Sequence, residues 1–308
     1  MIYLLLCIIS SSCIYVVFRL LKHYDVNTFQ AIVFNYFFCV ILGFFFLQVN
    51  GELNLEIFEL PESLWIFSAI VGLMFIVVFY LMARTTQVFG VAAGSIVSRM
   101  SLVIPAVYAI IFYNEVLTWQ KATGILLGLM AIYFIINKDK RKAAEGFAGV
   151  TLRKGALVLF PVLAFLGSGI VDTLVNIAKE EFVNGGSQNF FITFLFTSAF
   201  ILGSILLAIR LVLKHERLEW RNLVWGIPLG TVNFFSVFFI LLALSKSGLE
   251  GSVVWPINHV SIVALSTAIA ALFFHEHLNV KNWIGFGLSL VAILLITFHA
   301  WNGFLMNI

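Results

Sequence analysis

The chain is a succession of apolar segments, each close to twenty residues long, separated by short polar stretches. A helix needs about 20 apolar residues to cross a hydrocarbon core of about 30 Å. Hydrophobic residues make up 62% of the 308 positions and charged residues only 11%, which is too little charge to cover a water-soluble domain of this size. The sequence therefore predicts an all-α membrane protein.

Ten segments have the length and polarity of a transmembrane helix. They lie at about residues 2–18, 28–49, 63–83, 90–112, 118–136, 155–177, 188–210, 222–244, 251–273 and 281–299. The first has neither a basic start nor a small-residue cleavage site, so we interpret it as a retained helix rather than a signal peptide.

A stretch of the first half reappears in the second half. Residues 115–132 (EVLTWQKATGILLGLMAI) match residues 276–293 (EHLNVKNWIGFGLSLVAI) at a constant offset of 161, which pairs Glu115 with Glu276. A duplicated helical membrane unit is the usual sequence sign of a secondary transporter, whose two related halves enclose one site.

A basic polar connector at 138–154 separates a first repeat at 1–137 from a second at 155–308. Each repeat holds five of the predicted spans, and an odd number makes the second copy enter the membrane from the opposite side. We therefore predict ten transmembrane helices arranged as two inverted five-helix repeats.

The distribution of Lys and Arg predicts the orientation. Fourteen of the 18 fall in the odd-numbered loops, three fall on the other side, and Arg99 lies within a span. Basic loops stay in the cytoplasm, so the count places both termini outside the plasma (inner) membrane.

The repeated motif is a glutamate at the end of one span, a hydroxyl or amide three positions later and a glycine in the next span. It occurs as Glu115, Thr118 and Gly124, and again as Glu276, Asn279 and Gly285. It resembles the EamA-type ten-helix members of the drug/metabolite transporter superfamily over nearly the whole chain. The resemblance implies export or exchange of small metabolites, amino acids, nucleotide-like compounds or amphipathic toxicants without ATP hydrolysis. It also implies cytoplasmic termini, in conflict with the charge count.

Arg99 is the leading candidate for contact with a substrate. It is about the tenth residue of its predicted span, near the membrane midplane, where a charged side chain is costly. Its guanidinium suits a carboxylate or phosphate. The alternative is a structural arginine satisfied by carbonyls or by a carboxylate of a neighbouring helix.

Asn258 and His259 lie near the middle of the ninth span, at a depth comparable with Arg99, and are secondary candidates. His259 is either a substrate contact or proton carrier, or a buried polar residue of the core. Asp172, the carboxylate that lies clearly within a span, is either a proton-coupling site or a partner of Arg99.

Other polar and aromatic residues in the spans are weaker candidates. Asn35 and Asn233 carry amides that need partners in hydrocarbon, and Trp255 belongs to a set of aromatic residues that either form an amphipathic pocket or face lipid.

The repeated motif residues are expected to be structural. Glu115 and Glu276 each precede a predicted helix, whose positive N-terminal end favours a carboxylate. Gly124 and Gly285 begin small-x-x-x-small patterns, which let helices approach closely in lipid.

Motifs of hydrolases and metal sites are missing from the sequence. There is no G-x-S-x-G or H-E-x-x-H, and the histidines flanking Glu276 are two residues apart, so they point to different faces of a helix. Cys7, Cys13 and Cys39 share no metal spacing and are interpreted as small apolar core residues.

The sequence thus predicts a secondary transporter, rather than an enzyme, that exports or exchanges a small amphipathic metabolite by alternating access. Anionic metabolites and amino acids are the candidate substrates. No cofactor, metal or nucleic acid is expected, the lipid bilayer is the expected surrounding, and a monomer and a homodimer are both open. The alternatives are a non-catalytic membrane scaffold and a membrane-embedded enzyme.

Overall fold

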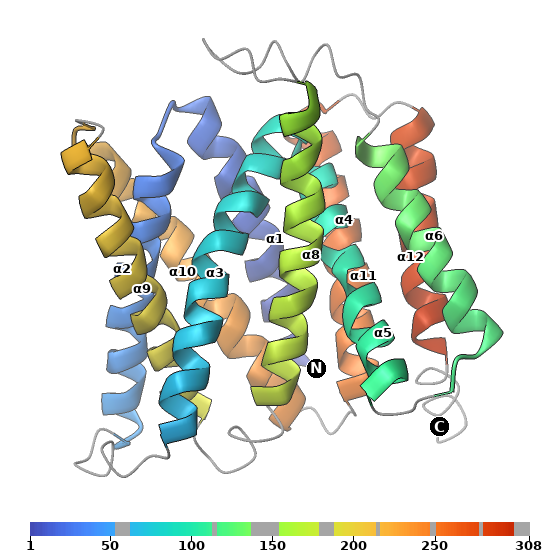
Figure 1. Ribbon diagram of the computed structural model, residues 1–308, viewed down its shortest axis with the longest axis horizontal. Coiled ribbons are helices and arrows are strands. Elements are labelled where there is room, and N and C mark those ends of the chain that lie inside the picture. Colours follow the sequence, from blue (N-terminus) through green and yellow to red (C-terminus); the bar gives the residue numbers. More distant parts are fainter. Residues whose placement is uncertain are drawn as a thin grey trace.

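The structure is a computed structural model that describes residues 1–52, 62–112, 116–136, 154–178, 188–213, 216–246, 251–276 and 280–298. Within these ranges all regular secondary structure is helical (Figure 1). The helices are α1 (Ile2–His23), α2 (Thr28–Val49), α3 (Glu62–Phe89), α4 (Val91–Arg99), the 3-10 turn η2 (Met100–Leu102), α5 (Val103–Phe112), α6 (Trp119–Ile136), α8 (Lys154–Ala178), α9 (Gln188–Leu213), α10 (Trp220–Lys246), α11 (Gly251–Leu272) and α12 (Val280–Ile296).

Seven helical segments in the described residues are long and apolar enough to cross a membrane. They are Ile2–His23, Thr28–Val49, Glu62–Phe89, Val91–Phe112, Val158–Val175, Gln188–Leu213 and Trp220–Lys246. Ile257–Leu272 and Val280–Ile296 are apolar but shorter. These lengths confirm a multi-pass membrane protein, whereas the full set of ten spans stays a prediction.

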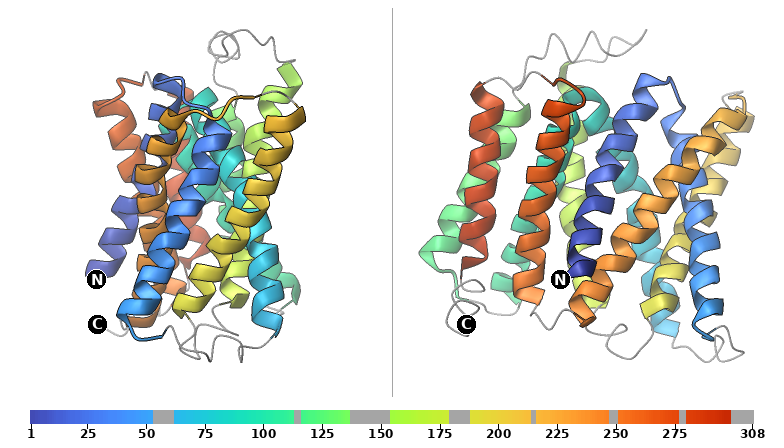
Figure 2. Two further views of the ribbon diagram at one scale, coloured as in Figure 1. Left: turned by 90° about the vertical axis from the view of Figure 1, so that its left-hand side faces the viewer. Right: turned by 180° about the vertical axis from the view of Figure 1, so that it is seen from behind.

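The helices run roughly parallel and antiparallel to one axis, with the start of α1 and the end of α12 toward the same, lower end of Figure 1. α2 packs along α9 and α10, α3 along α8 and α9, α1 along α10 and α11, and α4 along α8 and α11. α6 and α12 form a separate pair at one edge, which is visible in both Figure 1 and the right-hand view of Figure 2.

Glycines allow the closest helix contacts. A Cβ at Gly226 or Gly230 of α10 would lie 2.5 to 2.7 Å from Phe34 and the Asn35 carbonyl of α2. A Cβ at Gly124 of α6 would lie 2.8 to 3.0 Å from Ile296 and the Ala292 carbonyl of α12. The predicted role of Gly124 in helix packing therefore has a defined partner, and its repeat equivalent Gly285 is buried in α12.

α3 continues beyond the predicted end of its span at residue 83 because its polar end is satisfied within the helix. The Thr85 and Thr86 hydroxyls donate to the carbonyls of Leu81 and Met82 at 2.8 and 2.9 Å. Gln87 donates to the Thr28 hydroxyl of α2 at 2.8 Å. Hydrogen bonds to carbonyls four residues back let such side chains remain in a helix.

The predicted span at 90–112 is divided in two by the 3-10 turn η2, and Pro105 contributes to this break, although Pro161 and Pro228 lie within the continuous helices α8 and α10. A proline has no N–H to donate to the carbonyl four residues before it, here Ser101, and its ring clashes with that carbonyl. The regular helix stops at Arg99 and restarts at Val103. Arg99 thus stands at the C-terminal end of a short helix in the middle of the molecule.

Candidate functional site

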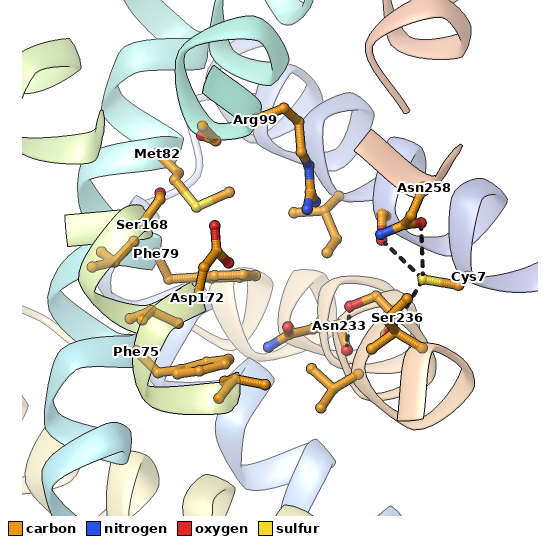
Figure 3. Close-up of a pocket in the computed structure, with 18 of the residues that line it drawn as sticks. Cys7, Phe75, Phe79, Met82, Arg99, Ser168, Asp172, Asn233, Ser236 and Asn258 are labelled. Carbon is orange, nitrogen blue, oxygen red and sulfur yellow. Dashed lines mark hydrogen bonds between the residues drawn. The ribbon is translucent and has the colours of Figure 1, made fainter. Parts of the chain in front are cut away.

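A cavity of about 130 Å³ lies between α1, α3, α4, α8, α10 and α11 (Figure 3). Its lining residues come from both predicted repeats: Cys7, Ser11, Ile14, Phe75, Val78, Phe79, Met82, Ser98, Arg99, Ser168, Val171, Asp172, Val175, Asn233, Ser236, Val237, Ile240, Trp255 and Asn258. Five of the residues predicted from the sequence to form the site therefore meet here: Arg99, Asp172, Asn233, Trp255 and Asn258.

α4 and α8 form one side of the cavity, which we call the charged wall (Arg99 and Asp172, with Ser98, Ser101 and Ser168). In Figure 3 Arg99 reaches into the cavity from α4, and Asp172 reaches toward it from α8. The Asp172 Oδ2 lies within hydrogen-bond distance of the Ser101 hydroxyl, at 2.8 Å. Electrostatic attraction acts between Arg99 and Asp172. The described residues nevertheless contain no ion pair within 4 Å between them.

The Arg99 guanidinium is incompletely satisfied. Its Nε is buried and has no hydrogen-bond partner. No hydrogen bond or ion pair of its side chain is formed within the part of the chain that the structure describes. A guanidinium offers five N–H donors, and a buried donor is costly to leave unpaired, so this group is suited to receive an anion from outside the protein.

The opposite side of the cavity, which we call the amide wall, consists of Cys7 from α1, Asn233 and Ser236 from α10, and Asn258 from α11, backed by Asn35 of α2. Asn233 Nδ2 donates to Asn35 Oδ1 at 3.1 Å. The Cys7 thiol lies 3.4 Å from Asn258 Oδ1 and 3.3 Å from the Ser236 carbonyl, as the dashed lines of Figure 3 mark. The polar groups of this wall are thus bonded largely to one another.

Asn35 and His259 lie outside the lining. Asn35 is fully buried behind Asn233, to which it is hydrogen-bonded. The His259 ring interacts with the Arg99 backbone and lies 5.8 Å from the Trp255 ring, while its Nδ1 is buried without a partner. Both residues support the cavity from behind, a placement that their position in the sequence did not reveal.

The remainder of the lining is apolar. Phe75, Phe79 and Met82 of α3 lie beside Asp172 in Figure 3, and Trp255 of α11 adds a further ring. A cavity with one cation, one carboxyl group, two amides and several rings is amphipathic. It matches the usual make-up of a small-molecule site, in which apolar residues dominate and a few polar groups fix orientation.

Glu276 has a partner that the sequence did not predict. Its Oε1 accepts a hydrogen bond at 2.9 Å from the backbone N–H of Val91, the first residue of α4, whereas the sequence placed it at the start of the following helix, α12. Sequence order cannot reveal this contact because the two residues are 185 positions apart. Its repeat equivalent, Glu115, lies outside the described residues.

Cys7 and Ser101 are among the residues of the site that the sequence did not single out. Cys7 was interpreted as an apolar core residue, and it is buried, but its thiol also lines the cavity. The signal available was Ser11, one helical turn later on the same face and also in the lining. Ser101, two residues after Arg99, carries the hydroxyl that contacts Asp172.

No group of three or more His, Cys, Asp or Glu side chains in the described residues is arranged to hold a metal ion. The features found are those of an integral membrane protein with a central amphipathic cavity between helices from both halves of the chain. Membrane proteins that carry small molecules have this form.

Comparison with known proteins gives a matching family model over the first part of the chain. Residues 1–137 match the EamA-like transporter family, which confirms the resemblance predicted from the repeated motif. The family is one of transporters rather than enzymes. An uncharacterized protein of Haemophilus influenzae is 28% identical over 293 residues, spanning 94% of this chain and 95% of the relative.

The fold also has a counterpart among solved structures. One crystal structure matches with a TM-score of 0.61 and 16% sequence identity, covering 98% of this chain and 97% of the other. At this identity the likeness concerns the fold alone.

Proposed function

We propose that this protein is a secondary transporter that exports or exchanges a small amphipathic metabolite by alternating access, with Arg99 binding an anionic group of the substrate. The observation that carries the proposal is the incompletely paired Arg99 guanidinium, whose Nε is buried, in a cavity that also holds Asp172 and several aromatic rings. Arginine binds carboxylate and phosphate groups in a bidentate geometry, and apolar rings accommodate the rest of such a molecule.

The architecture that we propose has ten transmembrane helices in two inverted repeats, at 1–137 and 155–308, joined by the connector at 138–154. The helix contacts support it. Under the repeat, α1, α2, α3, α4 and α6 correspond to α8, α9, α10, α11 and α12. The contacts of α1 with α10 and of α2 with α10 then have counterparts in those of α8 with α3 and of α9 with α3. Contacts that occur in related pairs are expected of a pseudo-two-fold axis.

Alternating access follows from such an arrangement, because either half can rock against the other around a central site. The cavity of about 130 Å³ is close in size to an engineered cavity of about 150 Å³ that holds one benzene molecule. A metabolite of larger size therefore requires the helices to move apart. For the orientation we retain the charge count, which places the basic ends of the helices in the cytoplasm and both termini outside.

Asp172 is the proposed proton carrier. The Ser101 hydroxyl lies 2.8 Å from Asp172 Oδ2 and 2.5 Å from the Ser98 carbonyl oxygen. A hydroxyl has one proton and a carbonyl can only accept, so both contacts are satisfied when the Asp172 carboxyl is protonated and donates to Ser101. Loss of this proton leaves a carboxylate facing Arg99, so a substrate anion and the Asp172 charge compete for one guanidinium. His259 is the second candidate for this role.

Ligand-dependent thermal stabilisation of the purified protein tests the proposal. Small carboxylates, phosphates, amino acids and neutral analogues are screened against the wild type, Arg99→Gln and Arg99→Lys. We expect that at least one anion stabilises the wild type. Its effect should be lost in Arg99→Gln and reduced in Arg99→Lys, because lysine keeps the charge but not the bidentate geometry.

Arg210→Gln is the matched control, since Arg210 lies over the Phe29 ring, with 4.2 Å between its guanidinium carbon and the ring centroid, far from the cavity lining. It should leave the stabilisation unchanged. An anion that stabilises the wild type and Arg99→Gln equally contradicts the assignment of Arg99. The absence of transport of any stabilising ligand in proteoliposomes favours the alternative of a membrane scaffold.

A further inference from the structure

Glu276 places a buried carboxylate at the start of α4, the helix whose other end carries Arg99. The side chain is 5% exposed, its Oε1 accepts the Val91 N–H at 2.9 Å, and the Arg19 Nε lies 3.9 Å from the same oxygen. Its Oε2 is buried and has no hydrogen-bond partner in the described structure. The carboxylate therefore depends on the positive end of α4 and on Arg19 of α1 to offset its burial.

The backbone at this point is shaped around the carboxylate. Gly90, between α3 and α4, has φ +101°, a conformation that other residues rarely adopt. A Cβ on Gly90 would collide with the carboxylate of Glu276, whose Oε1 and Cδ atoms would both lie 2.7 Å from it. The absence of a side chain at Gly90 thus lets a residue that follows α11 reach the N–H groups at the start of α4.

α4 connects this contact to the cavity. It is nine residues long, and it begins at Val91 beside Glu276 and ends at Arg99. At 1.5 Å per residue, the two ends are about 12 Å apart. Gly90 interrupts the regular helix before α4, and the 3-10 turn η2 interrupts it after α4. A short helix with a break at each end can shift as one piece, so a movement at Val91 moves Arg99 as well.

The start of α4, where Glu276 binds, lies at the upper end of Figure 1. We call this the basic end, because the predicted Lys- and Arg-rich loops lie on this side. Further polar bonds join neighbouring helices here. The Lys22 ammonium of α1 donates to the Gln87 carbonyl of α3 at 2.8 Å, and Asn222 of α10 donates to Gln30 of α2 at 2.7 Å. Between these bonds and the cavity, Phe18 and Leu21 are fully buried. These bonds and buried side chains hold the helices of the basic end together in this conformation.

We propose that Glu276 is a positioning residue that latches α4 when the basic end is closed, and so places Arg99 in the cavity. Release of the Val91 N–H from Glu276 frees α4 and the basic end to open together. Opening then carries Arg99 away from Asp172, which links the position of the anion-binding group to the side on which the cavity is open. This inference rests on the alternating-access function proposed above.

Cys7 provides a test that needs no identified substrate, because its thiol lines the cavity. In a background with Cys13→Ala and Cys39→Ala, the rate at which a membrane-impermeant methanethiosulfonate modifies Cys7 is measured in intact cells and in inside-out vesicles. A thiol at the exposed, basic-end position Tyr24 (Y24C, with Cys7→Ala) identifies which preparation presents the basic end. The readout is the ratio of the basic-end rate to the opposite-end rate.

We expect Cys7 of the parent protein to react mainly from the opposite end. Glu276→Ala should raise the ratio on the order of tenfold, as loss of a hydrogen bond to a charged group implies. Glu276→Gln should raise it less, because its amide oxygen still accepts from Val91. Gly90→Ala should act in the same direction as Glu276→Ala by displacing the carboxylate.

Glu52→Gln is the matched control at the other end of the molecule, where Glu52 accepts two bonds from Asn189 at 3.1 and 3.0 Å. It should not raise the ratio. A purely structural role of Glu276 lowers the melting temperature but leaves the ratio unchanged, and this result would overturn the latch. Should Glu276→Ala fail to fold, an unchanged ratio in Glu276→Gln and Gly90→Ala overturns it equally.

The two proposals fail in different ways. Failure of Cys7 to react from either end in the parent protein contradicts an alternately accessible cavity, and the latch with it. If Cys7 of the parent reacts mainly from one end and no Glu276 or Gly90 variant changes this, only the latch is wrong. The transport proposal is then unaffected.

Discussion

The charged wall and the amide wall face the same cavity but differ in how their polar groups are satisfied. On the amide wall, Asn233 is bonded to Asn35, and Cys7 contacts Asn258 and Ser236. On the charged wall, Arg99 has a buried Nε without a partner, and Asp172 has the Ser101 hydroxyl as its hydrogen-bond partner in the described residues.

This difference separates stability from function. Groups that satisfy one another hold helices together and gain little from a ligand. A guanidinium without a protein partner costs the folded state free energy, and that cost is offset when a ligand supplies the missing acceptor. We therefore expect changes on the charged wall to alter transport more than stability, and changes on the amide wall to do the reverse.

The largest expected effect is that of Arg99→Met on transport. Methionine retains the apolar stem but removes the charge, so transport of the stabilising anion should fall about a hundredfold, the loss of a charged hydrogen bond of about 3 kcal/mol. The melting temperature should stay constant or rise, because a cation with a buried, unpaired Nε is removed. Transport in proteoliposomes and thermal unfolding in detergent measure both quantities. A large drop in melting temperature would show that Arg99 stabilises the fold. The charged wall would then not differ from the amide wall in this respect.

The second prediction concerns Asp172→Asn, which keeps an oxygen for Ser101 but cannot exchange a proton. Accumulation of substrate under an imposed pH gradient should be lost, while exchange of substrate across the membrane continues within about tenfold of the wild-type rate. Measuring both modes in the same proteoliposomes separates coupling from binding. If coupling persists in Asp172→Asn and disappears in His259→Gln, the proton carrier is His259 and not Asp172.

The third prediction addresses the amide wall through Asn35 and Asn233. Replacing either residue by leucine should lower the free energy of unfolding by about 0.5–2 kcal/mol, the range for polar pairs between membrane helices. The double replacement should cost less than the sum, because the two changes remove one shared hydrogen bond. A double-mutant cycle by denaturant unfolding checks this. Additive losses would mean that the two amides act independently and that this wall is not a bonded unit.

Much of the fold follows from the sequence because membrane helices can be predicted from the length and low polarity of their segments. The segments at 28–49 and 188–210 match α2 and the greater part of α9, since hydrocarbon requires every backbone group to be bonded within its own helix. The division of the predicted span at 90–112 does not follow from Pro105 alone, because Pro161 and Pro228 lie within continuous helices.

The site was harder to predict because it depends on which helix faces meet. Arg99 and Asp172 stand out in the sequence since ionisable groups are rare in membrane spans. Cys7 does not stand out, because a cysteine in an apolar helix is usually a small core residue. The contact of Glu276 with Val91 joins elements 185 residues apart, and no local pattern encodes such a pairing.

The smallest expected effect is that of Cys7→Ser, and it tests how strictly the amide wall is satisfied. A serine hydroxyl can donate to the Ser236 carbonyl or to Asn258 Oδ1 in place of the thiol, which lies 3.3 and 3.4 Å from them. The free energy of unfolding should therefore change by less than about 0.5 kcal/mol, whereas Cys7→Ala, which leaves both acceptors without this donor, should cost about 1 kcal/mol. Thermal unfolding of both variants gives the comparison. Equal losses in Cys7→Ser and Cys7→Ala would show that the thiol stabilises this wall by packing alone, so that Asn258 is as available to a ligand as Arg99.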